Sequence, residues 1–178
     1  MRTLLLTGTL VVFLFTVCKQ ALPAEKDEAA IQSDPAKTAK RFLELLHAGK
    51  AAEAFELCAV SDKMPKPFLE DERGDLERIS APMKAGTWRI AFVEIHAKGA
   101  GAVAVTNEST KRGEPSFDLD PLYLVLLKGK WWVVPGVTKH KAASLLLPPE
   151  DYKVFESLEE WFRKRKQELA AKQSEDKP

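Results

Sequence analysis

Cysteine and histidine are scarce in this chain, whose 178 residues include two cysteines and three histidines. His47, His96 and His140 are scattered along the sequence, and no Cys-x-x-Cys pair occurs. Zinc sites are built from such ligands at short, regular spacings. The sequence therefore predicts no metal site and no cofactor.

An excess of charge of one sign is also lacking, because 27 Lys and Arg residues stand against 26 Asp and Glu residues. Removal of the targeting segment described below takes away Arg2 and Lys19, which leaves 25 basic and 26 acidic side chains. Proteins that bind nucleic acids or anionic membranes by electrostatic attraction carry a basic surplus. We therefore predict no nucleic-acid partner.

Long apolar runs are absent except at the N-terminus, where Arg2 precedes an uncharged stretch over residues 4–17. This stretch is short for a membrane span, and "ALPA", ending at Ala24, offers a small residue for cleavage. The pattern predicts a signal peptide over residues 1–24 and an exported protein, periplasmic or secreted. The alternative is a lipoprotein anchored through Cys18, although Val17 stands where that processing favours Gly or Ala.

After cleavage at Ala24, Cys58 is the single cysteine of the mature chain, so an internal disulfide is excluded in spite of the oxidising destination. Cys58 lies in the apolar stretch "AFELCAV". This setting favours a buried, inert thiol over a nucleophile.

Helical signals begin with Asp34 and Pro35, an N-cap followed by a first-turn proline, after a polar tether over residues 25–33. A second helix over residues 51–60 would complete a helical hairpin, and residues 68–83 predict a looser third helix. Near the C-terminus, apolar residues follow two prolines at helical spacing: Tyr152, Phe155, Leu158, Phe162 and Leu169. They predict an amphipathic helix over residues 148–172, followed by a disordered tail over residues 173–178.

Between these helices, residues 88–137 have the two-residue period of β-strands. The last hairpin, "LYLVLLKGKWWVV", turns at Gly129 and is apolar on both faces, with Tyr123 and Trp132 on one and Leu124 and Trp131 on the other. Both faces must therefore be covered. We predict that the helical hairpin covers one face, and that the C-terminal helix or a second copy, in a homodimer, covers the other.

This order of elements, with "AKRFLELLHAGKAAEAFEL" in the first helices and "YLVLLKGKWWVV" in the last hairpin, resembles the nuclear transport factor two-like superfamily over roughly residues 34–137. The resemblance implies an α+β fold in which a helical hairpin and a third helix pack on a curved antiparallel sheet. This cone would span residues 34–147 and hold a pocket at its mouth, with the C-terminal helix as an addition. Ketosteroid isomerase and the polyketide cyclases share the scaffold with non-catalytic domains, so no chemistry is implied.

Glu94 and His96 are the candidate catalytic residues. With strict alternation they would share a face with Trp88 and Phe92 and project into the cone, where an imidazole beside a carboxylate can act as a general base. We expect Trp88, Phe92 and Tyr123 to contact a ligand there. The alternatives are a solvated strand end for the catalytic pair and a core position for Tyr123.

The leading functional prediction is an exported, non-catalytic domain that binds a small apolar ligand, a peptide or an envelope protein. One alternative is a pocket enzyme of the isomerase, dehydratase or cyclase type that uses Glu94 and His96. The other is a structural dimerisation module.

Overall fold

The structure of the protein is a computed structural model that describes residues 30–110, 119–136 and 144–175. Three helices come first, then four strands and a long C-terminal helix: α2 (Pro35–His47), α3 (Ala51–Glu56), α4 (Lys66–Lys84), β1 (Trp88–Lys98), β2 (Gly101–Thr110), β3 (Leu119–Leu127), β4 (Lys130–Val133) and α6 (Pro149–Glu175). The strands form one antiparallel sheet in the order β1-β2-β3-β4. The predicted α+β class and antiparallel sheet are confirmed.

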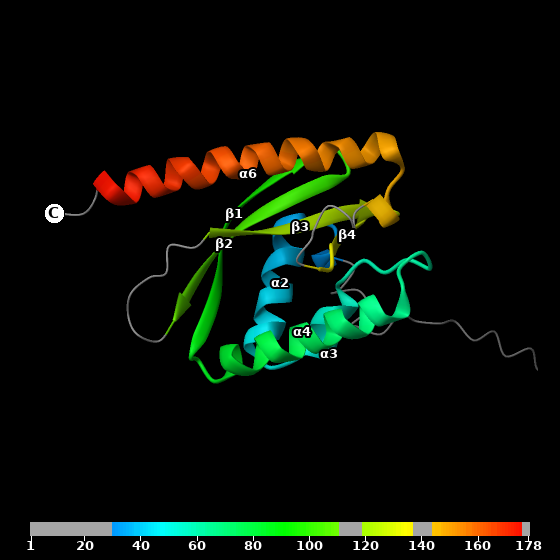
Figure 1. Ribbon diagram of the computed structural model, residues 1–178, viewed down its shortest axis with the longest axis horizontal. Coiled ribbons are helices and arrows are strands. Elements are labelled where there is room, and N and C mark those ends of the chain that lie inside the picture. Colours follow the sequence, from blue (N-terminus) through cyan, green and yellow to red (C-terminus); the bar gives the residue numbers. More distant parts are fainter. Residues whose placement is uncertain (1–29, 111–118, 137–143, 176–178) are drawn as a thin grey trace, which may run out of the picture.

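The sheet is curled and lies between two helical layers (Figure 1). Helices α2, α3 and α4 pack on what we call the inner face, and α6 runs along the opposite, outer face. A two-residue turn joins β3 to β4, with both Lys128 and Gly129 at positive φ, as a type I′ hairpin requires.

The inner layer begins at Asp34, whose carboxylate accepts hydrogen bonds from the backbone N–H groups of Ala36 (2.7 Å) and Lys37 (3.3 Å) and so caps α2 as predicted. Helix α3 ends at Glu56 rather than at residue 60. The chain beyond it pairs with β4 instead, because Val133 N–H donates to the Leu57 carbonyl and Val133 O accepts from Ala59 N–H. This pairing covers the free edge of β4.

The outer layer confirms the prediction that both faces of the last hairpin are covered. Leu124, Trp131 and Val133 belong to the inner core with α2 and α3, whereas Tyr123 and Val125 belong to an outer core with Phe155, Leu158 and Phe162 of α6. Each buried large apolar side chain contributes roughly 1.5–3 kcal/mol. The C-terminal helix is therefore the cover of the outer face, while the homodimer stays a prediction.

Two predicted segment boundaries need correction. Residues 30–33, assigned to a polar tether, pack against the domain, since Gln32 is buried and its carbonyl accepts a hydrogen bond from Trp131 N–H at 2.8 Å. Helix α6 continues to Glu175, into the predicted tail. The signal-peptide segment and residues 176–178 lie outside the described residues. None of the described helices is long and apolar enough to cross a membrane.

Candidate functional site

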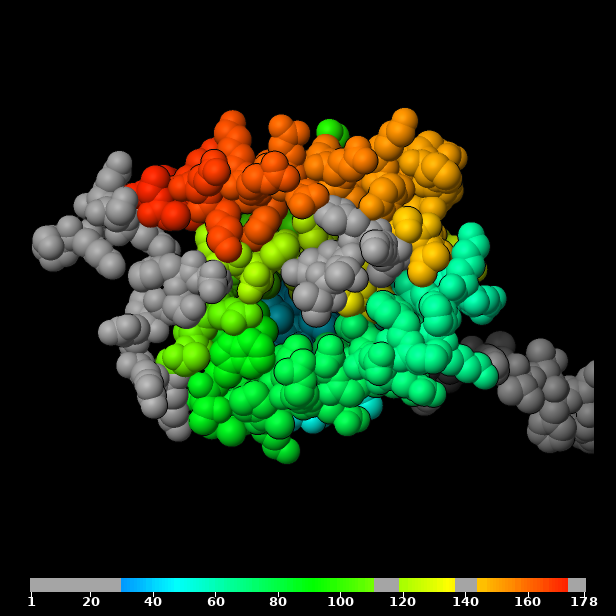
Figure 2. Space-filling model, viewed as in Figure 1, coloured from blue at the N-terminus to red at the C-terminus, as the bar shows by residue number. Residues whose placement is uncertain are grey.

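A pocket of about 290 Å³ opens between α2, α4 and the inner face of β1, β2 and β3. Its walls are mainly side chains that also contribute to the inner core: Phe42, Leu43, Leu46, Leu76, Ile79, Trp88, Ile90, Leu122 and Val133. In Figure 2 the atoms of α2 (blue) are visible at the bottom of a hollow between α4 and the strands. The described side chains therefore leave a hollow in the inner core on this side.

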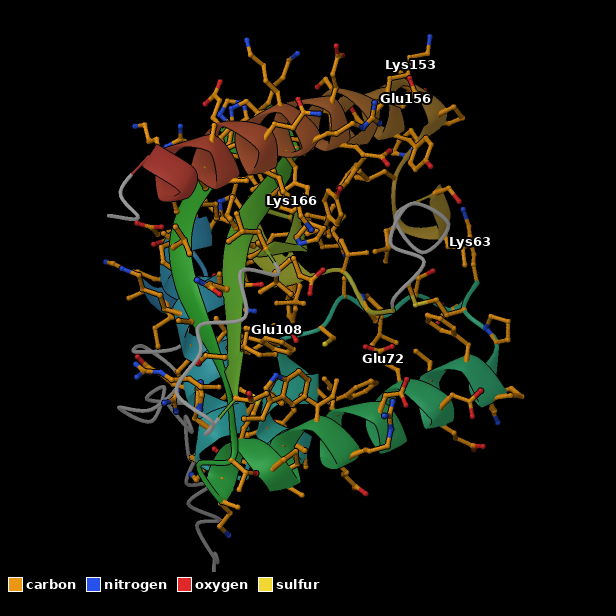
Figure 3. The ribbon with its side chains drawn as sticks, turned by 60° about the vertical axis from the view of Figure 1, so that its left-hand side comes forward. Lys63, Glu72, Glu108, Lys153, Glu156 and Lys166 are labelled. Carbon is orange, nitrogen blue, oxygen red and sulfur yellow. The ribbon has the colours of Figure 1, made fainter. Side chains whose placement is uncertain are left out.

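Charged side chains gather around the pocket. Glu72 and Asp75 of α4, Glu108 of β2 and Asp120 of β3 contribute carboxylates, and the single cation among the described lining residues is Arg78, 2.9 Å from the Asp75 carboxylate. Glu72 stands on the side of α4 that faces the rest of the domain, with Glu108 across the intervening space (Figure 3). With every group ionised, the described lining is net negative.

Glu72 has the most distinctive environment of these acids. It is half-buried, and burial raises the pKa of its carboxyl above the ordinary value, while a hydrogen bond from the Gly136 N–H lowers the pKa and the neighbouring Asp75 raises it. Gly136 has a φ of +95°, and a Cβ at this position would lie 3.2 Å from Phe68 Cζ. The glycine thus lets the backbone approach Glu72 in a conformation that other residues rarely adopt.

Of the three predicted ligand-binding residues, the structure places Trp88 in the pocket and the other two elsewhere. Phe92 is half-buried at the edge of the inner face, where Lys40 Nζ lies 4.8 Å from its ring centroid. Tyr123 points to the outer face and is 4% exposed beside Phe155. Burial and the nearby Glu159 raise the pKa of Tyr123 to about 12. Because its side chain belongs to the outer core, its hydroxyl does not serve the pocket.

The predicted catalytic pair also lies outside the pocket, because β1 contains a bulge. Phe92 pairs with Thr106 and Glu94 pairs with Val105, which leaves Val93 as an extra residue between them. A bulge of this kind shifts the alternation by one residue and exchanges the two faces of the strand beyond it. The expectation that Glu94 and His96 share a face with Trp88 and Phe92 is therefore wrong.

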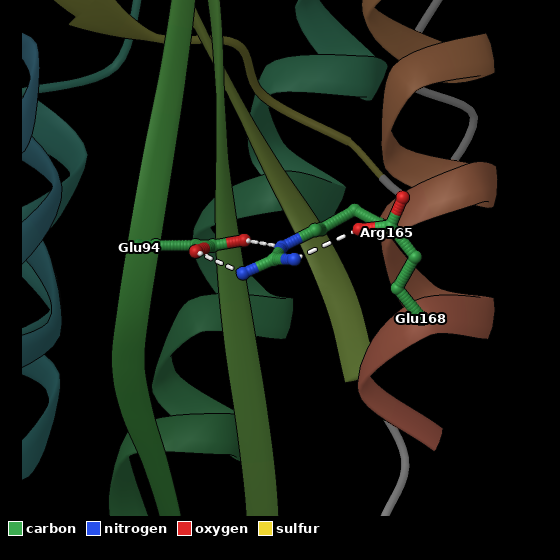
Figure 4. A network of polar contacts seen from close by, with 3 residues as sticks. All are labelled: Glu94, Arg165 and Glu168. Atoms are coloured by element: carbon green, nitrogen blue, oxygen red, sulfur yellow. Dashed lines mark hydrogen bonds and ion pairs between the residues drawn. The ribbon is translucent and has the colours of Figure 1, made fainter. Parts of the chain in front are cut away.

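On the outer face, Glu94 and His96 meet α6. The Arg165 guanidinium donates to both carboxylate oxygens of Glu94, with Nη2 at 3.0 Å from Oε2, and its Nη1 lies 2.8 Å from Glu168 Oε2 (Figure 4). The His96 ring stacks on Trp161 with centroids 4.6 Å apart. Their catalytic role stays a prediction, but both side chains tie β1 to the covering helix.

Sequence reasoning missed Glu72, although the sequence contains a signal for it. Residue 72 follows Leu69 by three positions and precedes Leu76 by four, so all three lie on one face of α4. Leu76 is buried and Leu69 packs against both cores. A carboxylate on the apolar stripe of a helix indicates a functional or specially paired group.

The described residues give little support for a nucleophilic cysteine or a metal site. Cys58 is 3% exposed, and burial, with a smaller contribution from Glu72, raises the pKa of its thiol, so the predicted buried thiol is confirmed. In the three described ranges, no group of three or more His, Cys, Asp or Glu side chains is arranged to hold a metal ion.

Comparison with known proteins adds little to these observations. No family model and no curated protein matches the chain. A solved structure described as an NTF2-like transpeptidase, from Campylobacter jejuni, is similar at 15% identity with a TM-score of 0.45, over 56% of this chain and 96% of that one. The helical hairpin, third helix and curled antiparallel sheet fit the NTF2-like fold that the sequence predicts. At this TM-score the likeness supports no statement about activity.

Proposed function

We propose that the protein is an exported binding domain whose inner pocket takes a small ligand with an apolar body and a basic group. The observation that carries this proposal is the combination of apolar walls with a net negative rim in a pocket of about 290 Å³. Ligand sites in proteins are commonly concave and mostly apolar, with a few polar groups that fix orientation. The pocket is at the small end of their usual size range.

The apolar walls favour the ligand's hydrocarbon part through burial, and Trp88 adds an aromatic surface that attracts a cation. Glu72 is the group best placed to pair with the cation. It is half-buried, so an ammonium group beside it would be screened less than at an exposed carboxylate. An anionic ligand of the same shape would meet carboxylates on α4, β2 and β3.

Export is supported by the pattern of residues 1–24 alone. The test is the N-terminus of the mature protein recovered from its native host. A chain that begins at Glu25 supports cleavage after Ala24. An acylated N-terminal Cys18 would show the lipoprotein alternative, and an uncleaved Met1 would contradict export by this signal.

Ligand chemistry can be tested with two probes of nearly equal shape, 2-phenylethylamine and the uncharged 2-phenylethanol. A ligand that binds the folded state raises the midpoint of thermal unfolding with concentration. We expect the amine to raise the midpoint more than the alcohol does, and the Glu72→Gln variant to reduce the amine's effect to that of the alcohol. Glu77→Gln, an exposed carboxylate on the same helix, is the matched control and should behave as the wild type.

Equal shifts with the two probes would show that charge plays no part in recognition. A full amine response in Glu72→Gln would show that the amine binds elsewhere. Either result contradicts the proposal without bearing on the fold.

A further inference from the structure

A second hollow lies at the tip of the β3–β4 hairpin, away from the inner pocket. It is an open groove of about 670 Å³ between the end of α3 and the hairpin turn, with Arg73 of α4 on its border. Its apolar surface comes from Phe55, Val60, Leu127 and Trp132. We call it the hairpin groove.

The groove exposes apolar surface that the two cores leave uncovered. Val60 is 51% exposed and, with Val93, is one of two large apolar residues exposed in the described ranges. Leu127 and Trp132, which pack against the outer core, are half-buried. A single exposed apolar side chain is normal in a folded protein. Val60, however, belongs to a concave apolar surface of the kind that binding sites have.

The cations of the groove stand around this apolar surface. Lys128 and Lys130 flank Gly129 in the hairpin turn. Lys130 pairs with Leu127 across the two strands and is two residues from Trp132, so Leu127, Lys130 and Trp132 share one face of the hairpin. The Arg73 guanidinium lies 4.5 Å from the Phe55 ring centroid. Neither lysine forms an ion pair with a residue in ranges 30–110, 119–136 and 144–175. With Glu56 as the single acid, the described lining is net positive.

The backbone around the groove is already paired, which limits how a partner can bind. Leu57 and Ala59 occupy the hydrogen-bonding edge of Val133, and Gln32 O accepts from Trp131 N–H. A partner therefore cannot extend the sheet at β4 and must be recognised by side chains. The Lys128–Gly129 turn holds the two lysines on a defined backbone.

We propose that the hairpin groove binds an acidic peptide segment of a partner protein, with an aromatic or aliphatic side chain of the segment on Val60 and Trp132. Carboxylates on either side of that anchor pair with Arg73, Lys128 and Lys130. Charge complementarity identifies the partner, because the groove combines an apolar floor with cations and one acid. This surface is separate from the inner pocket, so the proposed function and this interaction stand or fall independently.

The test uses fluorescein-labelled Asp-Glu-Phe-Asp-Glu and fluorescence anisotropy with the full mature chain. Two matched peptides replace Phe by Ala, or the four acids by Lys. We expect binding of the first peptide alone, weakening with added salt. Reversing both lysines, Lys128→Glu with Lys130→Glu, should weaken binding by about tenfold or more, since two attractive pairs are lost and each reversal adds repulsion.

Two further variants locate the site. Val60→Ser should weaken binding by about threefold or more through lost apolar contact. Lys153→Glu reverses one lysine charge on the outer surface of α6, away from the groove (Figure 3), and should bind as the wild type, as should Glu72→Gln. All these positions but Glu72 are exposed, so the variants should fold.

Several results would overturn the proposal. The first is no binding of the acidic Phe peptide, and the second is equal binding of all three peptides. The third is a loss of binding in Lys153→Glu as large as that in the variant with both groove lysines reversed. A wild-type dimer in analytical ultracentrifugation that Val60→Ser converts to a monomer would also overturn it, since a second copy would then occupy the groove.

Discussion

The inner face of the sheet packs against three helices and the outer face against one, although alternate residues of the same strands supply both faces. The outer face is closed, with Phe155 and Leu158 completely buried and α6 close to the backbone at Gly101. The inner face has just as apolar a core but contains a pocket whose rim carries carboxylates. A fully closed inner layer would bury the Glu72 carboxylate, which is costly without a cationic partner. The tightly packed face is thus the one that α6 covers, and the incompletely closed face is the one on which we propose the ligand pocket.

The largest expected effect concerns the closed face. Phe155→Ala should reduce the free energy of unfolding by about 3–5 kcal/mol, because the ring is fully buried and its removal leaves a cavity. Urea unfolding followed by circular dichroism measures the change. Glu156→Ala, one residue along and exposed, should stay within about 0.5 kcal/mol of the wild type.

The same measurement on Ile79→Ala sharpens the comparison. Ile79 is half-buried and lines the pocket, so part of its surface already lacks packing partners. The substitution should therefore reduce the free energy of unfolding clearly less than Phe155→Ala does. Equal losses at the two positions would show that the inner face is closed as tightly as the outer one.

A smaller effect should follow from adding one methyl group at Gly101. A Cβ there would lie 2.8 Å from Leu158 Cδ1 and 2.9 Å from Val154 Cγ1, so Gly101→Ala should destabilise by about 1–3 kcal/mol through overpacking under α6. Gly74→Ala is the matched control. Apart from its chain neighbours and the backbone of α4, no heavy atom of the described residues lies within 4 Å of its Cβ position, and the same substitution should stabilise by about 0.4–1 kcal/mol.

Thermal or urea unfolding of the two glycine variants gives the outcome directly. Opposite signs support close contact between α6 and β2. A stabilised Gly101→Ala variant would mean that α6 lies farther from β2 than the structure shows. The outer core would then be less tightly packed than the complete burial of Phe155 indicates.

Much of this fold follows from the sequence because its strongest signals are collective. Five apolar residues on each face of the last hairpin require two covering layers, and no local preference outweighs them. The helix after Pro148 is amphipathic and was one of two candidates for the outer cover. The cap at Asp34 and the turn at Gly129 are equally direct, since each depends on a residue type suited to its backbone position.

The candidate site was harder to predict because it depends on a single irregularity. Strict alternation along β1 places Glu94 and His96 beside Trp88, and the bulge at Val93 reverses that placement. Nothing in "WRIAFVEIHAK" marks the bulge, since it contains neither Gly nor Pro. The end of α3 was misplaced for a related reason. Pairing with β4 is a tertiary contact that local helix signals do not report.

The smallest expected effect is the pH dependence of stability that Glu72 contributes on the open face. Its pKa is raised in the folded protein, so the folded state binds the proton more tightly than the unfolded chain does. Stability from this residue is therefore greatest below the ordinary glutamate pKa and falls as pH rises through the raised one. The contribution should stay below about 1 kcal/mol, because the carboxylate is partly solvated and screened.

Urea unfolding of the wild type and Glu72→Gln at a series of pH values between about 3 and 7 isolates this contribution, because glutamine can still accept the Gly136 hydrogen bond but does not titrate. The variant should gain stability relative to the wild type as pH rises, and the difference should level off once Glu72 is ionised. Glu77→Gln removes the same charge from an exposed position of α4 and should show no such rise. A relative loss of stability in Glu72→Gln with rising pH would mean that a cation already compensates the carboxylate. The inner rim would then be a closed ion pair, and the contrast between the two faces of the sheet would fail at the residue on which it depends most.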